Sequence, residues 1–203
     1  VLGPLDMGHL TYNPNHTHLY GVDHFVSVYD LDDDYLYLHD PAGFACMKIQ
    51  FEDFLPAWQA QAIDYKRGAY SMWGNFKRVA NPDASAIYLV TSQIMAQRYL
   101  QGQEGVLSLY AAAVAKYGLN EEQKQLHQYF SFKLAAVRNL YLSRFLAEHD
   151  SLRSKIKEDL ASLFGQAHLS CLKEDYEDLS HLLLEIAELD EQFRTLCLEA
   201  RDC

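Results

Sequence analysis

Hydrophobic and polar residues follow different patterns in the two halves of the chain, and the pattern changes near residues 81–83. Before this point, four of the five prolines stand among short apolar runs rich in Tyr, His and Asp, which predicts short strands and loops. Beyond Pro82 there is no proline, and apolar residues recur at spacings of three and four, which predicts helices. We therefore expect an α+β chain, with a sheet region at residues 1–80 and a helical bundle at residues 84–203.

Polar residues divide the second half into about five helices. The expected helices span about residues 84–100, 104–117, 120–148, 150–165 and 173–199. Asn81 or Asp83 can cap the first of them, Asn120 the third and Asp150 the fourth, while Gly165 marks an end. The apolar residues of the last helix form one stripe, which we interpret as bundle core in preference to a partner surface.

The first half contains a hairpin signal at residues 21–43, where two alternating apolar segments flank an Asp-rich turn. If Val26 faces Leu38, one face of the hairpin is wholly aliphatic, which favours this register over a slip by one residue. The same register places His24 directly opposite Asp40, with Cβ atoms about 4.5–5.5 Å apart. The sequence therefore predicts a hydrogen bond between these two side chains.

A histidine held by an aspartate can serve as a general base. The carboxylate accepts a hydrogen bond from one ring nitrogen, and the other nitrogen can then take a proton from a thiol or hydroxyl group. The alternative is an ordinary His–Asp pair that braces the hairpin. Spacing alone favours the bracing role for His24 and Asp40, and the wider resemblance of the segment favours catalysis.

Several motifs of the first half resemble one enzyme family. Residues 23–26 and 37–43 are similar to the His and Asp strands of papain-like cysteine peptidases of the bacteriocin-leader type. The fuller set resembles the butirosin-biosynthesis acyltransferase family, in which a papain-like part precedes a helical part. The motifs are GPLDMG at residues 3–8, GVDHF at 21–25, HDPAG at 39–43 and FEDFLPAW at 51–58.

This resemblance implies cysteine-based acyl transfer in antibiotic biosynthesis, from the phosphopantetheine arm of an acyl carrier protein to a small-molecule amine. His24 would be the base and Asp40 its orienting partner. His9 and Asp6 would contact the substrate, although Asp6 could equally cap a turn. The resemblance implies no resident cofactor.

The nucleophile of such a triad is not found in the expected place. Papain-like chains place a cysteine before the histidine, whereas no Cys precedes His24, and Cys46 follows Asp40 in the wrong order. Because the chain opens with Val1, we expect that a Cys-bearing upstream part is missing. The alternatives are a cysteine peptidase or amidase of the same fold, and a non-catalytic binding or assembly module.

Composition narrows the classes of partner. The net charge of −11 argues against nucleic-acid binding, and no apolar run reaches the roughly 20 residues of a membrane span. The four cysteines follow no CxxC spacing, so we expect free thiols in the cytoplasm. A homo-oligomer paired through the long helices remains open. The cysteines are Cys46, Cys171, Cys197 and Cys203.

Two clusters invite a metal interpretation that we do not favour. His16 and His18 lack a third ligand at a recognisable spacing and follow a loop sequence. The aspartates of residues 30–34 lack the Gly and the terminal Glu of a calcium loop. We therefore predict a solvated turn and no metal site.

Overall fold

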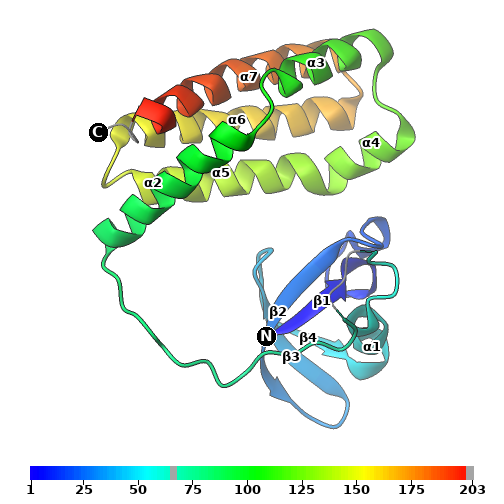
Figure 1. Ribbon diagram of the computed structural model, residues 1–203. Helices are drawn as coiled ribbons and strands as arrows, with labels where there is room; N and C mark the ends of the chain where they lie inside the picture. Colours follow the sequence, from blue (N-terminus) through cyan, green and yellow to red (C-terminus); the bar gives the residue numbers. More distant parts are fainter. Residues whose placement is uncertain (65–67, 200–203) are drawn as a thin grey trace. The chain divides into compact units, whose positions relative to one another are not determined.

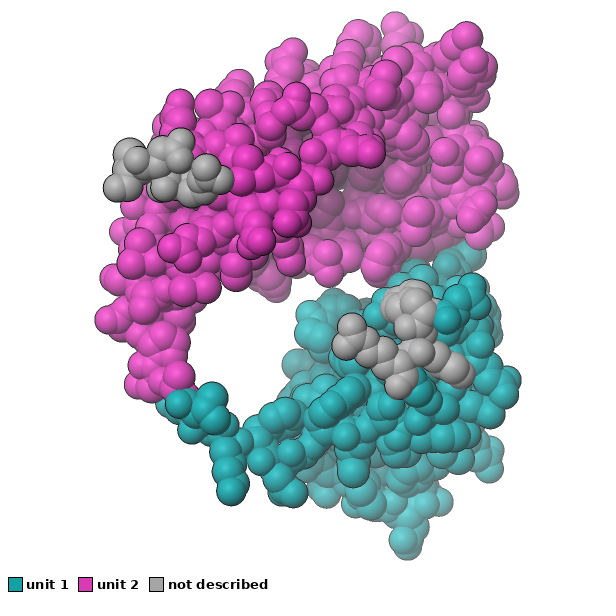
Figure 2. Space-filling view, in the orientation of Figure 1, with its two compact units in different colours: residues 1–79 teal, residues 80–203 magenta. Residues whose placement is uncertain are grey.

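The computed structural model describes residues 1–64 and 68–199. The chain divides into two compact units, residues 1–79 and 80–203 (Figures 1 and 2). The first contains an antiparallel four-stranded sheet and the second is helical, which confirms the predicted α+β class. We call them the sheet unit and the helical unit.

The sheet unit is a meander in which each strand pairs with the next along the chain. Its strand order is β1-β2-β3-β4. The strands are β1 (Leu2–Asp6), β2 (Asp23–Leu31), β3 (Tyr35–Asp40) and β4 (Phe44–Gln50), and helix α1 (Phe51–Gln59) follows directly. Short 3₁₀ turns, Met7–His9 and His16–His18, connect β1 to β2.

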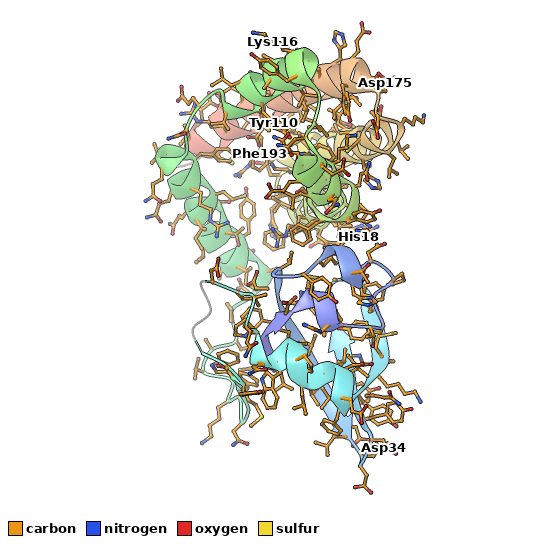
Figure 3. The ribbon with its side chains drawn as sticks, turned by 90° about the vertical axis from the view of Figure 1, so that its right-hand side faces the viewer. His18, Asp34, Tyr110, Lys116, Asp175 and Phe193 are labelled. Carbon is orange, nitrogen blue, oxygen red and sulfur yellow. The ribbon has the colours of Figure 1, made fainter. Side chains whose placement is uncertain are left out.

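Alternation of side chains gives this sheet one buried face. Val26 of β2, Leu36 and Leu38 of β3 and Ile49 of β4 are buried, as is Phe54 of α1. The opposite face carries aromatic side chains, among which the ring of Tyr29 lies 6.3 Å from that of Tyr37. The aliphatic face of the hairpin is therefore as the sequence predicted. Asp34 lies at the tip of the β2–β3 hairpin (Figure 3).

The predicted hairpin register is wrong by two residues. Val28, and not Val26, pairs with Leu38, and a bulge shifts the register further between Val28 and Asp30. A shift of two residues keeps every side chain on its own face, so the aliphatic pattern cannot distinguish the two registers. The observed register goes with the long turn and the bulge, and the apolar pattern predicts neither of these features.

The helical unit consists of long helices that pack around one core. They are α2 (Ala84–Gln101), α3 (Val106–Tyr117), α4 (Glu121–Leu126), α5 (Phe132–Leu146), α6 (Ser151–Lys173) and α7 (Tyr176–Glu199). A π-helical turn, His127–Ser131, joins α4 to α5. None of the helices within residues 1–64 and 68–199 combines the length and the apolar character that a membrane crossing needs.

Side-chain caps begin three of these helices. The carboxylate of Asp83 accepts from Ala86 N, Asn120 forms a capping box with Gln123, and Asp150 accepts from Arg153 N. These bonds satisfy amide groups that no helical carbonyl can reach. They confirm the caps predicted at Asn120 and Asp150 and select Asp83 over Asn81.

The predicted end of a helix at Gly165 is wrong. Helix α6 continues to Lys173 and ends at Glu174, which adopts a left-handed conformation. A glycine inside a helix costs about 1 kcal/mol relative to alanine. Leu160 and Ala167, on either side of Gly165, are fully buried, and their packing outweighs that cost.

The apolar stripe of α7 lies in the core of the helical unit. Leu179, Leu183, Ile186 and Phe193 are all buried, and α7 packs against α2, α3 and α6. Figure 3 labels Phe193 inside this unit, together with Tyr110 of α3. Periodicity at three and four thus correctly predicted which face of α7 is buried.

Candidate active site

His24 and Asp40 lie at the same end of two neighbouring antiparallel strands. His24 is the second residue of β2 and Asp40 is the last residue of β3. Given the observed register, the two residues are diagonal neighbours and not a directly facing pair. His24 Nε2 nevertheless lies 2.6 Å from Asp40 Oδ1, because a diagonal pair on one face is within reach of a long side chain.

The Asp40 carboxylate is buried and accepts three hydrogen bonds. Oδ1 accepts from His24 Nε2 and, at 2.7 Å, from Ala42 N, while Oδ2 accepts from the Tyr12 hydroxyl group at 2.7 Å. Its side chain has no exposed surface. Burial alone would raise the pKa of this carboxyl group, but the bonds from His24, Ala42 and Tyr12 outweigh it and leave the pKa below its ordinary value. Asp40 is therefore ionised near neutral pH.

Tyr12 also belongs to the site, which the sequence did not predict. Its pKa is raised, first by burial and then by the hydrogen bond to Asp40, so the phenol remains a donor. The residue lies in the segment between β1 and β2, 28 residues before Asp40. No local pattern links these two positions, and only the fold brings them together.

The geometry leaves one nitrogen of His24 for chemistry. In the neutral ring, the proton lies on Nε2 towards the ionised Asp40, and Nδ1 then carries the lone pair. Within residues 1–64 and 68–199, no hydrogen bond to Nδ1 is found. The His24 side chain is 14% exposed. Such a ring can act as a base towards a group brought to Nδ1.

The thiol of Cys46 does not join this pair. Its backbone N–H donates to His39 Nδ1 at 3.0 Å, and His39 stacks on Tyr29 with ring centroids 4.6 Å apart. His39 pairs with the exposed Ser27, on the face opposite the buried one. Within the described residues, no hydrogen bond connects a thiol to His24. Cys46, Cys171 and Cys197 are free, and Cys203 lies outside the described residues.

The hydrogen bonds and ring contacts of Asp6 and His9 are with residues other than His24 and Asp40. Asp6 is buried, and its Oδ1 accepts from Gly8 N at 2.8 Å and from Gly21 N at 3.0 Å, so this carboxylate caps turns. His9 packs edge-on against Tyr20 with ring centroids 5.3 Å apart. No hydrogen bond among the described residues connects either side chain to His24 or Asp40.

The two clusters considered for metal binding have other roles. Asp32 accepts from the N–H groups of Asp34 and Tyr35 and from the Tyr37 hydroxyl group, so it organises the exposed hairpin turn. His16 Nδ1 lies 2.9 Å from the carbonyl oxygen of Asn13. Across the described residues, no group of three or more His, Cys, Asp or Glu side chains could hold a metal ion.

Comparisons with known proteins give the family. A family model described as the YobF C-terminal domain matches residues 96–198. The chain belongs to this family. It is also 33% identical over 204 residues to a protein of Bacillus subtilis (strain 168) that is described as uncharacterized protein YobF. The match covers 96% of this chain but 66% of that YobF protein.

These matches overturn the resemblance to the butirosin-biosynthesis acyltransferase family. Both lead to YobF, and neither leads to that enzyme family. The short motifs around His24 and Asp40 are compatible with many sheets in which a histidine meets an aspartate, so they could not establish a family. No solved structure matches this chain.

Proposed function

We propose that the sheet unit supplies the general base and the orienting carboxylate of a cysteine-based acyl-transfer site. The observation that carries this proposal is the 2.6 Å contact between His24 Nε2 and the fully buried Asp40 carboxylate. A buried, ionised carboxylate holds the imidazole in one tautomer and stabilises the imidazolium that forms when the ring takes a proton. The Tyr12 hydroxyl group donates to the same carboxylate and helps to keep it ionised.

The proposed reaction has two steps. His24 Nδ1 takes the proton of a cysteine thiol, and the thiolate attacks the carbonyl carbon of an acyl thioester and releases the donor thiol. An amine then attacks the new thioester, the cysteine leaves, and the amine loses a proton to the imidazole. The nucleophile of the proposal is a cysteine that is not among residues 1–203. The proposed donor is an acyl carrier protein, and the acceptor is a small amine.

A papain-like fold is the finer assignment that goes with this reaction. Its support is the antiparallel sheet in which the histidine is the second residue of one strand and the aspartate is the last residue of the next. The same pair would serve a cysteine peptidase or amidase if water replaced the amine. An experiment is therefore needed to show whether an amine or water accepts the acyl group.

The test uses the gene product that contains residues 1–203, with an acyl-N-acetylcysteamine thioester and a primary amine. We expect amine-dependent release of thiol, with a loss of about 10²–10⁴-fold in His24→Ala. His39→Ala is the matched control, because His39 lies next to Asp40 in β3 but stacks on Tyr29. Full turnover in folded His24→Ala overturns the proposal, and thiol release that needs no amine indicates hydrolysis.

A further inference from the structure

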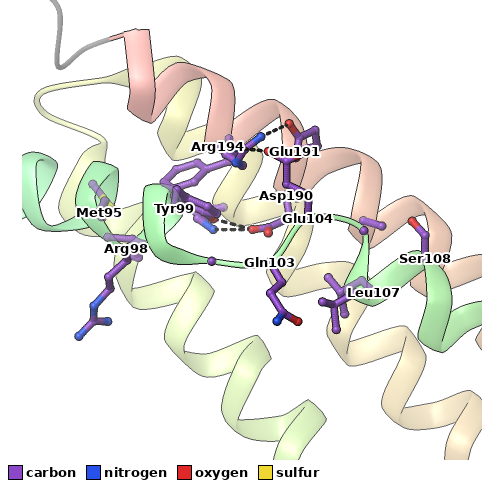
Figure 4. Close-up of a pocket in the computed structure, with 17 residues that line it drawn as sticks. Met95, Arg98, Tyr99, Gln103, Glu104, Leu107, Ser108, Asp190, Glu191 and Arg194 are labelled. Atoms are coloured by element: carbon purple, nitrogen blue, oxygen red, sulfur yellow. Dashed lines mark hydrogen bonds and ion pairs between the residues drawn. The ribbon is translucent and has the colours of Figure 1, made fainter.

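The helical unit contains a cavity of about 790 Å³ between α2, the start of α3, α6 and α7. Figure 4 shows its lining, with Tyr99 of α2 facing Asp190 of α7. Met95, Leu107 and Leu142 provide apolar surface, and Lys157 of α6 provides a primary amine. Charged side chains such as Arg98, Glu104 and Arg194 line it beside the apolar ones. A pocket of this volume is typical of small-molecule sites.

Lys157 is buried beside one carboxylate and one aromatic ring. Its side chain is 7% exposed, and Nζ lies 3.7 Å from Asp190 Oδ1 and 3.7 Å from the ring centre of Phe193. The nearby thiol of Cys197 has a pKa raised by burial and contributes no negative charge near neutral pH. Burial lowers the pKa of Lys157, and the attraction of Asp190 does not offset it.

The ion pair of Lys157 with Asp190, at 3.7 Å, is longer than the ion pairs of other cations in this region. Arg194 forms ion pairs with Glu104 and Glu191, and Arg153 Nε lies 2.6 Å from Asp150 Oδ2. Asp190 Oδ1 accepts its short bond, 2.7 Å, from the Tyr99 hydroxyl group. A lysine placed in this way is held as a neutral amine more readily than an exposed one, and a neutral amine is a nucleophile.

We propose that this cavity binds an aldehyde or ketone with an apolar body and that Lys157 forms an imine with its carbonyl carbon. The amine attacks the carbonyl carbon to give a carbinolamine, which loses water as the C=N bond forms. The two amine hydrogens leave with the carbonyl oxygen as that water molecule. No redox partner is needed, and the reaction is reversible.

The groups around Lys157 suit both steps. Asp190, which reaches both Lys157 and Tyr99, can take the proton of the zwitterionic adduct and return it to the departing hydroxyl group. Tyr99 remains a phenol because burial and Asp190 raise its pKa. The apolar lining gives the carbon chain of the ligand a place to pack. The site lies wholly within the helical unit and does not depend on the function proposed for His24.

Reductive trapping of the intact protein tests the proposal. The protein is treated at pH 7 with butanal and sodium cyanoborohydride, and alkylated lysines are located by peptide mass spectrometry. Lys155 is the matched internal control, since it lies in the same helix but is 63% exposed and ion-paired with Glu158 and Asp159. Those partners raise its pKa.

We expect Lys157 to be alkylated faster than Lys155, because burial lowers the pKa of Lys157 and the ion pairs of Lys155 raise its pKa. This preference should vanish in urea, because it arises from burial in the fold. Lys157→Arg should lose the adduct at this position and retain that at Lys155. Equal or slower labelling of Lys157 in the native protein, or a preference that survives in urea, would overturn the proposal.

Discussion

His24 and Asp40 touch across two strands without facing each other in the ladder. Val28 pairs with Leu38, so Asp40 lies diagonally from His24, yet Nε2 and Oδ1 are 2.6 Å apart. A diagonal neighbour is within reach of a long side chain such as that of histidine. The buried carboxylate is completed by Tyr12 from a segment outside the hairpin. Hydrogen bonds to this carboxylate therefore connect β2, β3 and the segment between β1 and β2.

Tyr12→Phe should destabilise the sheet unit by about 1–2 kcal/mol. The substitution removes the hydroxyl donor and leaves Asp40 Oδ2 buried without a partner. Tyr20→Phe is the control, because Tyr20 is exposed and its change should stay within about 0.5 kcal/mol. Urea unfolding followed by tyrosine and tryptophan fluorescence measures both. Equal stabilities of the two variants would contradict the role assigned to Tyr12.

The ionised Asp40 should make the sheet unit sensitive to acid. Its pKa in the folded state lies below the ordinary value of about 3.9, so its stabilising contribution is complete above that value. As the pH falls through the lowered pKa, Asp40 binds a proton in the folded state and the contribution is lost.

Asp40→Asn is the variant that reports this contribution. It should be less stable than the parent at pH 6, and the difference should shrink towards pH 2. Unfolding curves across this range measure the gap. A gap that stays constant with pH would show that ionisation of Asp40 does not stabilise the fold.

Two helix caps of the same kind should differ in importance. Asn120→Ala removes the capping box of α4 and should cost about 1 kcal/mol. Asp150→Ala removes the cap of α6 and also leaves the buried Arg153 without its carboxylate, which should cost about 3 kcal/mol. Thermal unfolding followed by circular dichroism separates them. Equal losses would mean that the Asp150–Arg153 pair adds nothing beyond capping.

Neighbouring leucines of α7 should respond very differently to truncation. Leu183 is 1% exposed and Leu184 is 41% exposed. Leu183→Ala should cost about 2–5 kcal/mol through lost burial and the cavity it leaves. Leu184→Ala should cost less than about 1 kcal/mol. The free energies of unfolding in urea provide the comparison, and a large loss at Leu184 would indicate that its face is covered in solution.

The sequence predicted the helices of the second unit better than it predicted the residues of the candidate site. The caps at Asn120 and Asp150 and the buried face of α7 follow from local hydrogen bonding and from periodicity, which neighbouring residues determine. The helix end predicted at Gly165 was wrong because the low helix propensity of one glycine is outweighed by the packing of the buried residues on either side of it. The motifs near His24 suggested a family that the full-chain comparison replaced with YobF.

The sequence by itself determined the α+β class, the aliphatic face of the hairpin and the meeting of His24 with Asp40, because side chains two residues apart share a face. Only the tertiary structure decided the register, the third donor Tyr12, and the burial of Lys157 beside Asp190. Those features join residues that are far apart along the chain. Their energies depend on distance and solvent exclusion, which no local pattern records.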